Sequence, residues 1–514
     1  MSSAPAPWWQ SAVVYQIYPR AFADSNGDGI GDLAGLQDRL DYIRDLGVDA
    51  VWLSPIFPSP MCDNGYDVKD YCDIDPLFGD LATFDALLAA AHERDLRVLL
   101  DWVPNHTSSL HPWFVDSRSS RTSVHRDWYY WRDGRDGDPS TPPNNWLAAF
   151  GGRAWTWDDT TSQWYLHLFL PEQPDLNWGN PAVQTAMHDT LRFWLDRGVD
   201  GFRMDVIHLI GKDPALPDAP PEQAHTNRVA YNDYPGTHPM LRGIRAVLDS
   251  YPGERVMVGE VNLRETARIS TYYGNGDELN LAFNFLSLSA SWDVDKWRSL
   301  IETVGRDLQP GAWPTWVLSN HDARRLRTRL GGSEQKARAM AVLLLTLRGT
   351  PFLYAGEELG LEDADVPPAH ALDPGGRDGC RAPIPWTADP PHGWVGQLPP
   401  LPFSPASESR SVEREVADDN SMLALYRRML GVRRGSPALQ LGELELLACP
   451  PGVLAFVRRC AGDERRVLLN FTDTHAPVAV ESSCDIEVAS HDARVTGEYD
   501  GVVPPEAALV LRPS

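Results

Sequence analysis

The chain has 514 residues, a formal net charge of −25 at pH 7, 43% hydrophobic residues and 23% charged residues. A chain of this length accommodates a large catalytic domain with one or two smaller domains, and its composition is that of a folded globular protein. The strongly acidic balance disfavours nucleic acids and anionic membrane surfaces as partners and suits a neutral small-molecule substrate.

Neither a signal peptide nor a membrane span is predicted. Residues 1–10 lack a basic segment followed by an apolar one, and the sequence has no long uninterrupted apolar run. The six cysteines form no Cys-x-x-Cys pair and lack zinc-site spacing, so free thiols are expected, with a Cys62–Cys72 bridge as the alternative. We therefore expect a cytoplasmic protein.

Apolar runs bounded by turn residues predict eight strands, and amphipathic helical segments alternate with them. The predicted strands are 13–18, 50–54, 97–102, 201–205, 256–260, 280–285, 315–319 and 351–355. The predicted helices are 33–46, 81–94, 181–196, 239–250, 297–306, 333–347 and 420–434. Eight β–α units predict an α/β fold, the closed parallel (β/α)8 TIM barrel.

Two connections are much longer than the usual few residues. One runs from Pro104 to about Asn177 and is rich in Trp, Pro, Asp and Gly, so we expect a small domain inserted after the third strand. The other follows the eighth strand, from Gly356 to about Asp419. Short strand-like runs after Pro437 predict a C-terminal antiparallel β-sandwich. The predicted domains are the barrel (1–104 and 178–436), the inserted domain (105–177) and the sandwich (437–514).

The fourth predicted strand carries two charges on one face. Arg203 and Asp205 are two residues apart, so their side chains point the same way in a strand. Burying both is costly unless the charges serve each other or a ligand. They form either a structural ion pair or an aspartate nucleophile kept ionised by an adjacent guanidinium.

Polar residues also follow other strands at their carboxyl ends, where barrel active sites lie. Glu260 ends the fifth strand, and His321 and Asp322 follow the seventh. His106 comes after the third. Several carboxylates without nearby cysteine ligands suit the cleavage of glycosidic bonds, which needs an acid, a nucleophile or base, and charge that stabilises the transition state.

These stretches together resemble the signature motifs of the α-amylase superfamily, glycoside hydrolase family 13, and within it those of bacterial α-glucosidases and oligo-1,6-glucosidases. The resemblance covers essentially the whole chain. Residues 101–106 are similar to the first signature region, 201–205 to the second, 259–260 to the third, 319–322 to the fourth, and 173–177 to an additional motif near the end of the inserted domain.

The resemblance implies a role for each matched residue. Asp205 is the expected nucleophile, Glu260 the acid and base, and Asp322 the group that grips the distorted sugar. Glu260 is then protonated at rest while Asp205 is charged, and Arg203 is expected to lower the pKa of the nucleophile. The implied substrate-binding residues are Tyr66, Asp67, His106, Phe169, Arg203, His321 and Arg377. Retention of configuration is expected, with the two carboxyl groups about 5–5.5 Å apart.

A second feature is the glycine-rich stretch 24–32, in which oxygen-bearing side chains alternate along the chain. Such ligands suit a hard cation, Ca²⁺ or Mg²⁺, and a metal-free turn rich in Asx residues is the alternative. The stretch looks like the start of an EF-hand loop, although Gly35 stands where that loop has its final Glu. The family resemblance implies a structural Ca²⁺ site made of Asp24, Asn26, Asp28, the Ile30 carbonyl and Asp32; no organic cofactor is expected.

The expected activity is that of a retaining α-glucosidase that removes terminal glucose from short oligosaccharides, as a monomer or homodimer. In relatives, valine at the position of Val206 accompanies α-1,6 cleavage, and threonine or alanine accompanies α-1,4 cleavage. Two alternatives stand: a transglucosylase or isomerase of the sucrose isomerase or trehalose synthase type, and a non-catalytic relative such as a transporter subunit. The carboxylates and the lack of a membrane helix disfavour the second.

Overall fold

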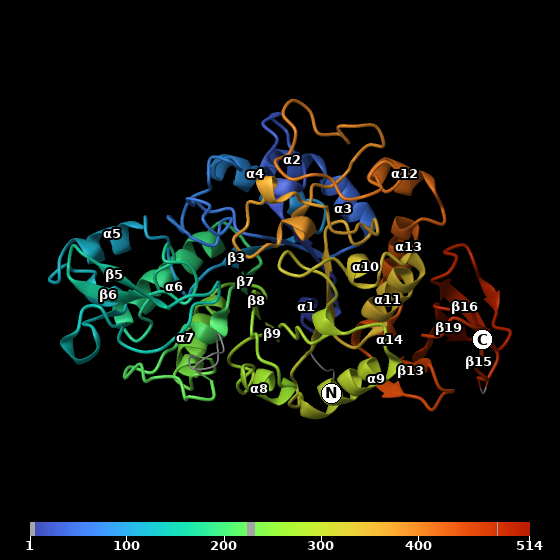
Figure 1. The fold of residues 1–514 in the computed structure, drawn as a ribbon. Coiled ribbons are helices and arrows are strands. Elements are labelled where there is room, and N and C mark those ends of the chain that lie inside the picture. The colour runs from blue at the N-terminus through green and yellow to red at the C-terminus, as the bar shows by residue number, and fades with distance from the viewer. Residues whose placement is uncertain (1–5, 224–231, 481) are drawn as a thin grey trace.

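The computed structural model describes residues 6–223, 232–480 and 482–514. Eight parallel strands form one curved sheet at its centre (Figure 1). Their order is β10 (Thr315–Val317), β11 (Thr350–Tyr354), β1 (Val14–Ile17), β2 (Ala50–Leu53), β3 (Arg97–Trp102), β7 (Gly201–Met204), β8 (Val256–Gly259) and β9 (Leu281–Ala282). This order confirms the predicted (β/α)8 barrel.

Thr315 connects the two ends of this sheet. Its hydroxyl donates to the Ala282 carbonyl on β9 (2.9 Å) and accepts from the backbone N–H of Asn284 (3.2 Å). The hydrogen bonds between β9 and β10 are therefore made by a side chain and not by paired backbone groups. The barrel is nearly closed.

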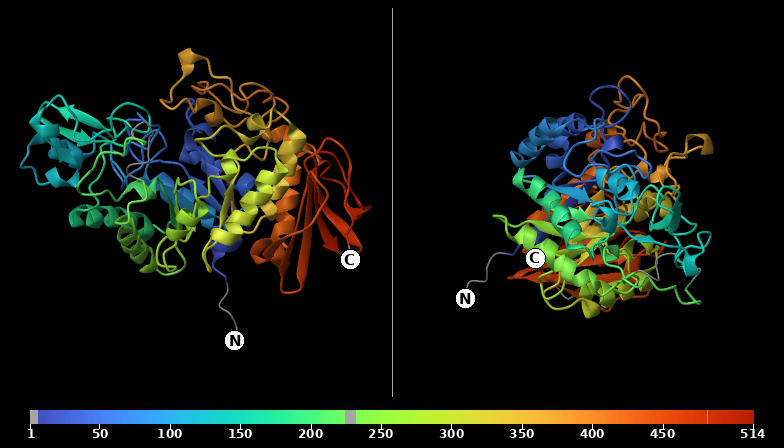
Figure 2. Two further views of the ribbon diagram at one scale, coloured as in Figure 1. Left: turned by 60° about the horizontal axis from the view of Figure 1, so that its bottom comes forward. Right: turned by 90° about the vertical axis from the view of Figure 1, so that its left-hand side faces the viewer.

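Helices surround the sheet (Figure 2). They are α1 (Trp8–Ser11), α2 (Leu33–Asp38), α3 (Leu40–Leu46), α4 (Leu81–His92), α6 (Pro181–Asp196), α7 (Thr237–Asp249), α8 (Thr266–Thr271), α9 (Val294–Asp307), α10 (Leu326–Arg329), α11 (Glu334–Thr346), α12 (Val412–Ala417), α13 (Met422–Arg434) and α14 (Pro437–Leu441). Helix α6 begins where Asn180 caps it by accepting from the Ala182 N–H, with Pro181 in the first turn. The region 33–46, predicted as one helix, is two, because the chain leaves helical geometry at Arg39, whose guanidinium lies 4.2 Å from the Trp386 ring.

The segment between β3 and α6 projects from the barrel, at the left in Figure 1. It contains a helix that the sequence did not predict, α5 (Pro112–Ser119), and an antiparallel sheet in the order β4 (Trp131–Arg132), β6 (Gln163–Leu166), β5 (Trp155–Asp158). A buried ion pair ties this segment to the barrel: Lys212 Nζ lies 2.8 Å from Asp175 Oδ2, and both side chains are fully buried.

Removing the cation from this pair leaves a buried, ionised carboxylate that keeps only uncharged donors, the Asn105 amide and the Leu168 N–H. Lys212→Met is therefore expected to lower the free energy of unfolding by about 3–5 kcal/mol. Urea unfolding followed by fluorescence measures the change. The same substitution at exposed Lys69 is the control, and an equal effect of the two substitutions would contradict the prediction.

The C-terminal region forms a six-stranded antiparallel sheet, as predicted, which packs beside the barrel helices (Figure 2). Its order is β12 (Glu443–Leu446), β13 (Val453–Cys460), β14 (Asp463–Asn470), β19 (Ala508–Pro513), β16 (Cys484–Ala489) and β17 (Gly497–Glu498), and β15 (Ala476–Pro477) pairs with β18 (Val502–Val503). Buried Arg458 on β13 donates to the Thr346 carbonyl, and Arg433 donates to the Leu345 carbonyl. Both cations therefore lie at the C-terminus of α11, where the helix dipole favours positive charge.

All six cysteines are free thiols, so Cys62 and Cys72 form no bridge. Across the described ranges, the structure contains no helix with the length and apolar character needed to cross a bilayer.

Candidate active site

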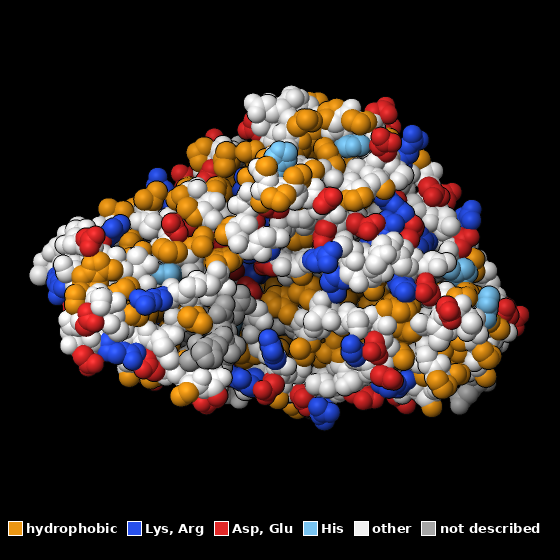
Figure 3. Space-filling model, in the orientation of Figure 1, with side chains coloured by type: hydrophobic (Ala, Val, Ile, Leu, Met, Phe, Trp, Pro, Cys, Tyr) orange, Lys and Arg blue, Asp and Glu red, His pale blue; other side chains and the backbone are white. Residues whose placement is uncertain are grey.

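A cavity of about 660 Å³ opens at the carboxyl ends of the barrel strands. Figure 3 shows acidic side chains at the bottom of a hollow on this face. Seven of the predicted site residues line the cavity: Tyr66, His106, Phe169, Asp205, Glu260, Asp322 and Arg377. The barrel thus brings together side chains from segments far apart in the sequence.

One guanidinium joins the carboxylates on one side of the cavity. Arg203 Nη1 lies 2.6 Å from Asp205 Oδ1 and 2.8 Å from Asp101 Oδ1, and its Nη2 lies 2.5 Å from Glu260 Oε2. Arg203 itself is only 2% exposed. These carboxylates occupy its donors and Arg203 does not line the cavity, so its role as a substrate-binding residue stays a prediction.

Backbone geometry places the two expected catalytic residues next to each other. Strands β7 and β8 pair in parallel with Met204 opposite Gly259, so Asp205 and Glu260 follow at neighbouring strand ends. Val206 adopts φ 33° and ψ 40°, which is unusual for a β-branched residue and costs about 1–3 kcal/mol. This conformation directs the Val206 N–H to Glu260 Oε2 at 3.2 Å.

The same cluster controls the protonation of its members. Burial raises the pKa of the Asp205 carboxyl well above its usual value, Arg203 lowers it, and Glu260 raises it. Burial also raises the pKa of Asp101, to about 6, against the opposing effect of Arg203. The expectation that Arg203 lowers the pKa of Asp205 describes one contribution but not the net direction. Three carboxyl groups share one cation, so the cluster favours retaining a proton.

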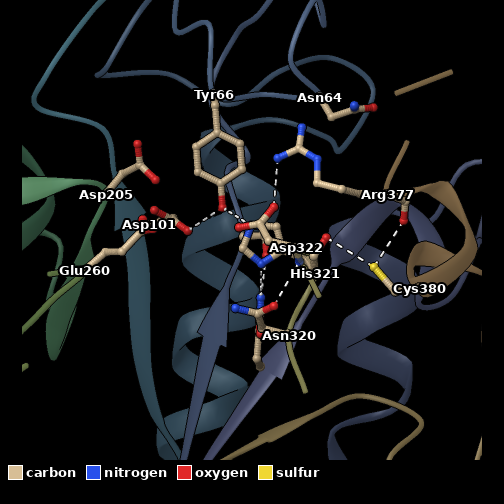
Figure 4. A network of polar contacts seen from close by, with 12 residues as sticks. Asn64, Tyr66, Asp101, Asp205, Glu260, Asn320, His321, Asp322, Arg377 and Cys380 are labelled. Carbon is tan, nitrogen blue, oxygen red and sulfur yellow. Dashed lines mark hydrogen bonds and ion pairs between the residues drawn. The ribbon is translucent and has the colours of Figure 1, made fainter. Parts of the chain in front are cut away.

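The opposite wall is a network of ion pairs, and Figure 4 shows the one between Arg377 and Asp322. Arg377 Nη1 lies 2.8 Å from Asp322 Oδ1, Arg377 Nη2 lies 2.7 Å from Asp63 Oδ1, and Arg381 Nη2 lies 3.1 Å from Asp322 Oδ1. Burial raises the pKa of Asp322, but His321 and the two arginines lower it well below its usual value. Asp322 is therefore ionised at neutral pH.

Asp67 was predicted to hold the sugar, but it does not line the cavity. Its fully buried carboxylate accepts hydrogen bonds from the Ser59 hydroxyl and from the backbone N–H groups of Cys62 and Asp63. Asp63 lines the cavity instead. Asn64 and Gly65 both have positive φ, so the chain reverses between Asp63 and Tyr66. The Asn-Gly pair in the sequence was the signal for this turn.

The two predicted histidines lie at different depths. His106 lines the cavity, and burial lowers its pKa to about 4, so it is neutral. His321 is 0% exposed, and its Nε2 lies 2.6 Å from the Tyr66 hydroxyl and 3.2 Å from Asp322 Oδ2. These protein groups are the neighbours of that nitrogen, and direct donation from His321 to the sugar stays a prediction.

Apolar side chains complete the cavity. The Phe169 ring lies 5.0 Å from His106 and 6.2 Å from Phe150, which also lines the cavity. Phe285 and Leu288 also line the cavity. Neither of these two residues was singled out from the sequence, because each belongs to an ordinary apolar run.

The stretch 24–32 folds into consecutive Asx turns. Asp24 accepts from the N–H groups of Asn26, Gly27 and Gly29, Asn26 accepts from the Asp28 N–H, and Asp28 accepts from the Ile30 N–H. Asp32 caps α2 by accepting from the Gly35 N–H. Within the described residues, no three His, Cys, Asp or Glu side chains form a metal-binding group. The oxygen-rich donor set suits Ca²⁺ chemically, and the turns also close the loop without a metal.

A parallel barrel with paired carboxyl groups at its mouth defines the class, a glycoside hydrolase. Residues 16–442 match the model described as alpha amylase, catalytic domain, and the chain belongs to the α-amylase family.

Similar proteins indicate the group within this family. The chain is 43% identical over 503 residues to the probable alpha-glucosidase of Rhizobium meliloti (strain 1021), covering 91% of this chain and 90% of the relative. It is 36% identical over 515 residues to the oligo-1,6-glucosidase of Parageobacillus thermoglucosidasius, covering 91% of each. The crystal structure of the alpha-glucosyl transfer enzyme XgtA is similar with a TM-score of 0.91 and 40% identity, covering 99% of this chain and 100% of that chain. These matches confirm the predicted α-glucosidase and oligo-1,6-glucosidase group.

Proposed function

We propose that this protein is a retaining, exo-acting α-glucosidase that releases α-D-glucose from the ends of short α-glucosides. The observation that carries the proposal is the single Arg203 side chain that holds Asp205 and Glu260 together on one side of the cavity. A paired nucleophile and acid is what the double-displacement mechanism needs.

In the first step, an Asp205 oxygen attacks the anomeric carbon, and the Glu260 carboxyl gives its proton to the leaving oxygen. The bond to the aglycone breaks and a glucosyl ester of Asp205 forms. In the second step, Glu260 removes a proton from water, and the hydroxyl attacks the same carbon and displaces Asp205. Ionised Asp322 interacts more strongly with the positively charged transition state than with the ground state.

The opposite wall supports exo action. Arg377 pairs with Asp63, Asp322 and Asp373, so charged groups close the cavity where a longer chain would continue past the terminal glucose. We infer that Asp63, Arg377 and His106 hold the hydroxyls of that glucose and that Tyr66 stacks on its ring.

A substrate panel of maltose, isomaltose, sucrose and trehalose tests this function. The expected result is free glucose in excess of any rearranged disaccharide. The alternative is a transglucosylase or isomerase, which the similarity to XgtA favours. The apolar side chains of Phe285 and Leu288, which line the cavity, would assist such an activity by limiting water. Rearranged or transferred products in excess of glucose would establish that alternative and overturn the hydrolase.

Val206 lies in the wall directly beside the nucleophile and lines the cavity. We propose that its branched apolar surface favours α-1,6 linkages. Val206→Thr is expected to change the ratio of kcat/KM for isomaltose over maltose by about 10-fold in favour of maltose, since one group in a pocket wall discriminates by about 1–3 kcal/mol. Paired steady-state assays measure the ratio, and an unchanged ratio would refute this role.

We also propose that the 24–32 loop binds a structural Ca²⁺ through Asp24, Asn26, Asp28 and the Ile30 carbonyl, with Asp32 fixing the loop to α2. An ion bound only by the folded state stabilises that state. Chelation is therefore expected to lower the Tm more than it lowers activity measured well below the Tm, and Ca²⁺ is expected to restore the Tm. Identical melting curves with and without chelator would show that the loop needs no metal.

A further inference from the structure

His321 is a buried histidine whose two ring nitrogens both have side-chain neighbours. Its Nδ1 lies 2.6 Å from Nε2 of Gln16, a residue of β1 that is 1% exposed. On the other side, Nε2 lies 2.6 Å from the Tyr66 hydroxyl and 3.2 Å from Asp322 Oδ2. Figure 4 shows His321 beside Tyr66 and Asp322. The proposed mechanism assigns His321 no proton transfer.

These neighbours determine which nitrogen carries the proton. Burial lowers the pKa of His321 to about 3, so the ring is neutral at pH 7 and has one N–H. Asp322 is ionised and can only accept a hydrogen bond. The proton therefore lies on Nε2, and Nδ1 accepts. The Gln16 amide must then present its NH₂ group to Nδ1, since an amide oxygen would face a lone pair.

We propose that Gln16 is a positioning residue that holds His321 in its Nε2–H tautomer, so that this proton orients Asp322 and Tyr66 for the sugar. The tautomer of a histidine is set by the bond at its other nitrogen. Part of the proposal rests on the proposed function, because the sugar contacts of Asp322 and Tyr66 belong to it.

The effect of Gln16 extends across the cavity floor. The Tyr66 hydroxyl accepts from Nε2 and donates its own proton to Asp101 Oδ2 at 3.0 Å. Asp101 in turn shares the Arg203 guanidinium with Asp205. A chain of hydrogen bonds with one direction thus runs from β1 to Asp101, and Arg203 links Asp101 to the nucleophile by donating to both carboxylates.

Loss of the amide donor makes the Nδ1–H tautomer accessible. The lone pair of Nε2 then faces the Asp322 carboxylate, which repels it. Asp322 leaves the position in which it stabilises the transition state, so kcat falls while binding of the ground-state sugar changes less.

Three variants test this role. Gln16→Met removes the donor at similar volume, Gln16→Glu replaces it by a group that titrates, and Ser54→Ala is the control, because it removes only the other side-chain neighbour of the amide, at 3.3 Å. Gln16→Met is expected to lower kcat/KM about 10–100-fold, mainly through kcat, as is typical when an orienting partner is lost. Ser54→Ala is expected to stay within about 3-fold of wild type.

The pH profile separates positioning from a structural role. In Gln16→Glu the introduced carboxyl group donates to Nδ1 when protonated. When ionised it accepts a hydrogen bond from Nδ1–H and so favours the tautomer that has no proton on Nε2. Its kcat/KM relative to wild type is therefore expected to fall as the pH rises, whereas the ratio for Gln16→Met stays constant. Profiles of Gln16→Glu that run parallel to wild type would overturn the proposal.

The tautomer of His321 can also be measured in the wild-type protein, so this test does not depend on whether the Gln16 variants fold. NMR spectra of protein labelled with ¹⁵N-histidine report the ring nitrogens, and the signals of His321 are identified as those absent from the spectrum of the His321→Asn variant. The shifts are expected to show a protonated Nε2 and an unprotonated Nδ1 from about pH 5 to 8, and a proton on Nδ1 would refute the role of Gln16. Absence of glucose release from every α-glucoside would instead refute the proposed function and leave the tautomer unaffected.

Discussion

Asp205→Asn is expected to reduce kcat/KM for maltose and isomaltose by about 10⁴-fold or more, the size of loss seen when a catalytic nucleophile is removed. The amide has nearly the volume of the carboxylate but does not attack the anomeric carbon. Arg203 keeps its contacts with Asp101 and Glu260, so the variant is expected to fold. Steady-state assays measure the loss, and thermal melts verify the fold.

The matched control is Asp200→Asn, the same substitution just before the opposite end of β7. Asp200 is mostly buried and accepts from the backbone N–H of Val98, away from the cavity. This control is expected to lower the Tm and to leave kcat close to wild type. Activity of Asp205→Asn within about 10-fold of wild type would show that Asp205 is not the nucleophile.

Glu260→Gln is expected to reduce kcat/KM for maltose by about 10³-fold, within the range for loss of a general acid. The effect depends on the leaving group: an aryl α-glucoside with an acidic phenol needs no protonation, so its first step is expected to change little. The second step stays slow because no base activates water. A rapid burst of phenol and a glucosyl ester on Asp205 are therefore expected, measured by stopped flow and by mass spectrometry of the intact protein.

Equal losses of kcat/KM for maltose and for the aryl glucoside would contradict this role of Glu260. Such a result would mean that the substitution disturbs the whole cluster, since Glu260 shares Arg203 with Asp205. The burst amplitude distinguishes the two cases, because it reports the ester directly.

Much of the fold was predictable because the barrel strands are short, apolar and separated by clear helical periodicity. Helix α6 has the predicted bounds, with Asn180 and Pro181 marking its start and Arg197 following its end. Helix α5 was missed, because the inserted segment packs through scattered aromatic residues and has no regular apolar period. The domain boundaries, the oligomeric state and the cytoplasmic location stay predictions.

The candidate site was predictable where a residue directly ends a strand, as Asp205 and Glu260 do. The site was not predictable where a residue's contribution depends on how deeply its side chain is buried beneath the cavity surface. Arg203 and His321 do not line the cavity, and other side chains contact their donors. Asp63 lines the cavity and Asp67 does not, since a turn with two positive φ angles reverses the chain between them. Neither the burial of a side chain nor this reversal of the chain can be deduced from the spacing of residues in the sequence.

In the proposed mechanism Asp205 attacks the anomeric carbon directly, while Glu260 protonates the leaving oxygen. The stereochemistry of the product tests it most directly. When isomaltose or an aryl α-glucoside is hydrolysed in an NMR tube, we expect α-glucose to appear first and the β anomer to accumulate only later through mutarotation. Initial release of β-glucose would mean that water, not Asp205, attacks the sugar, and would refute the double-displacement mechanism.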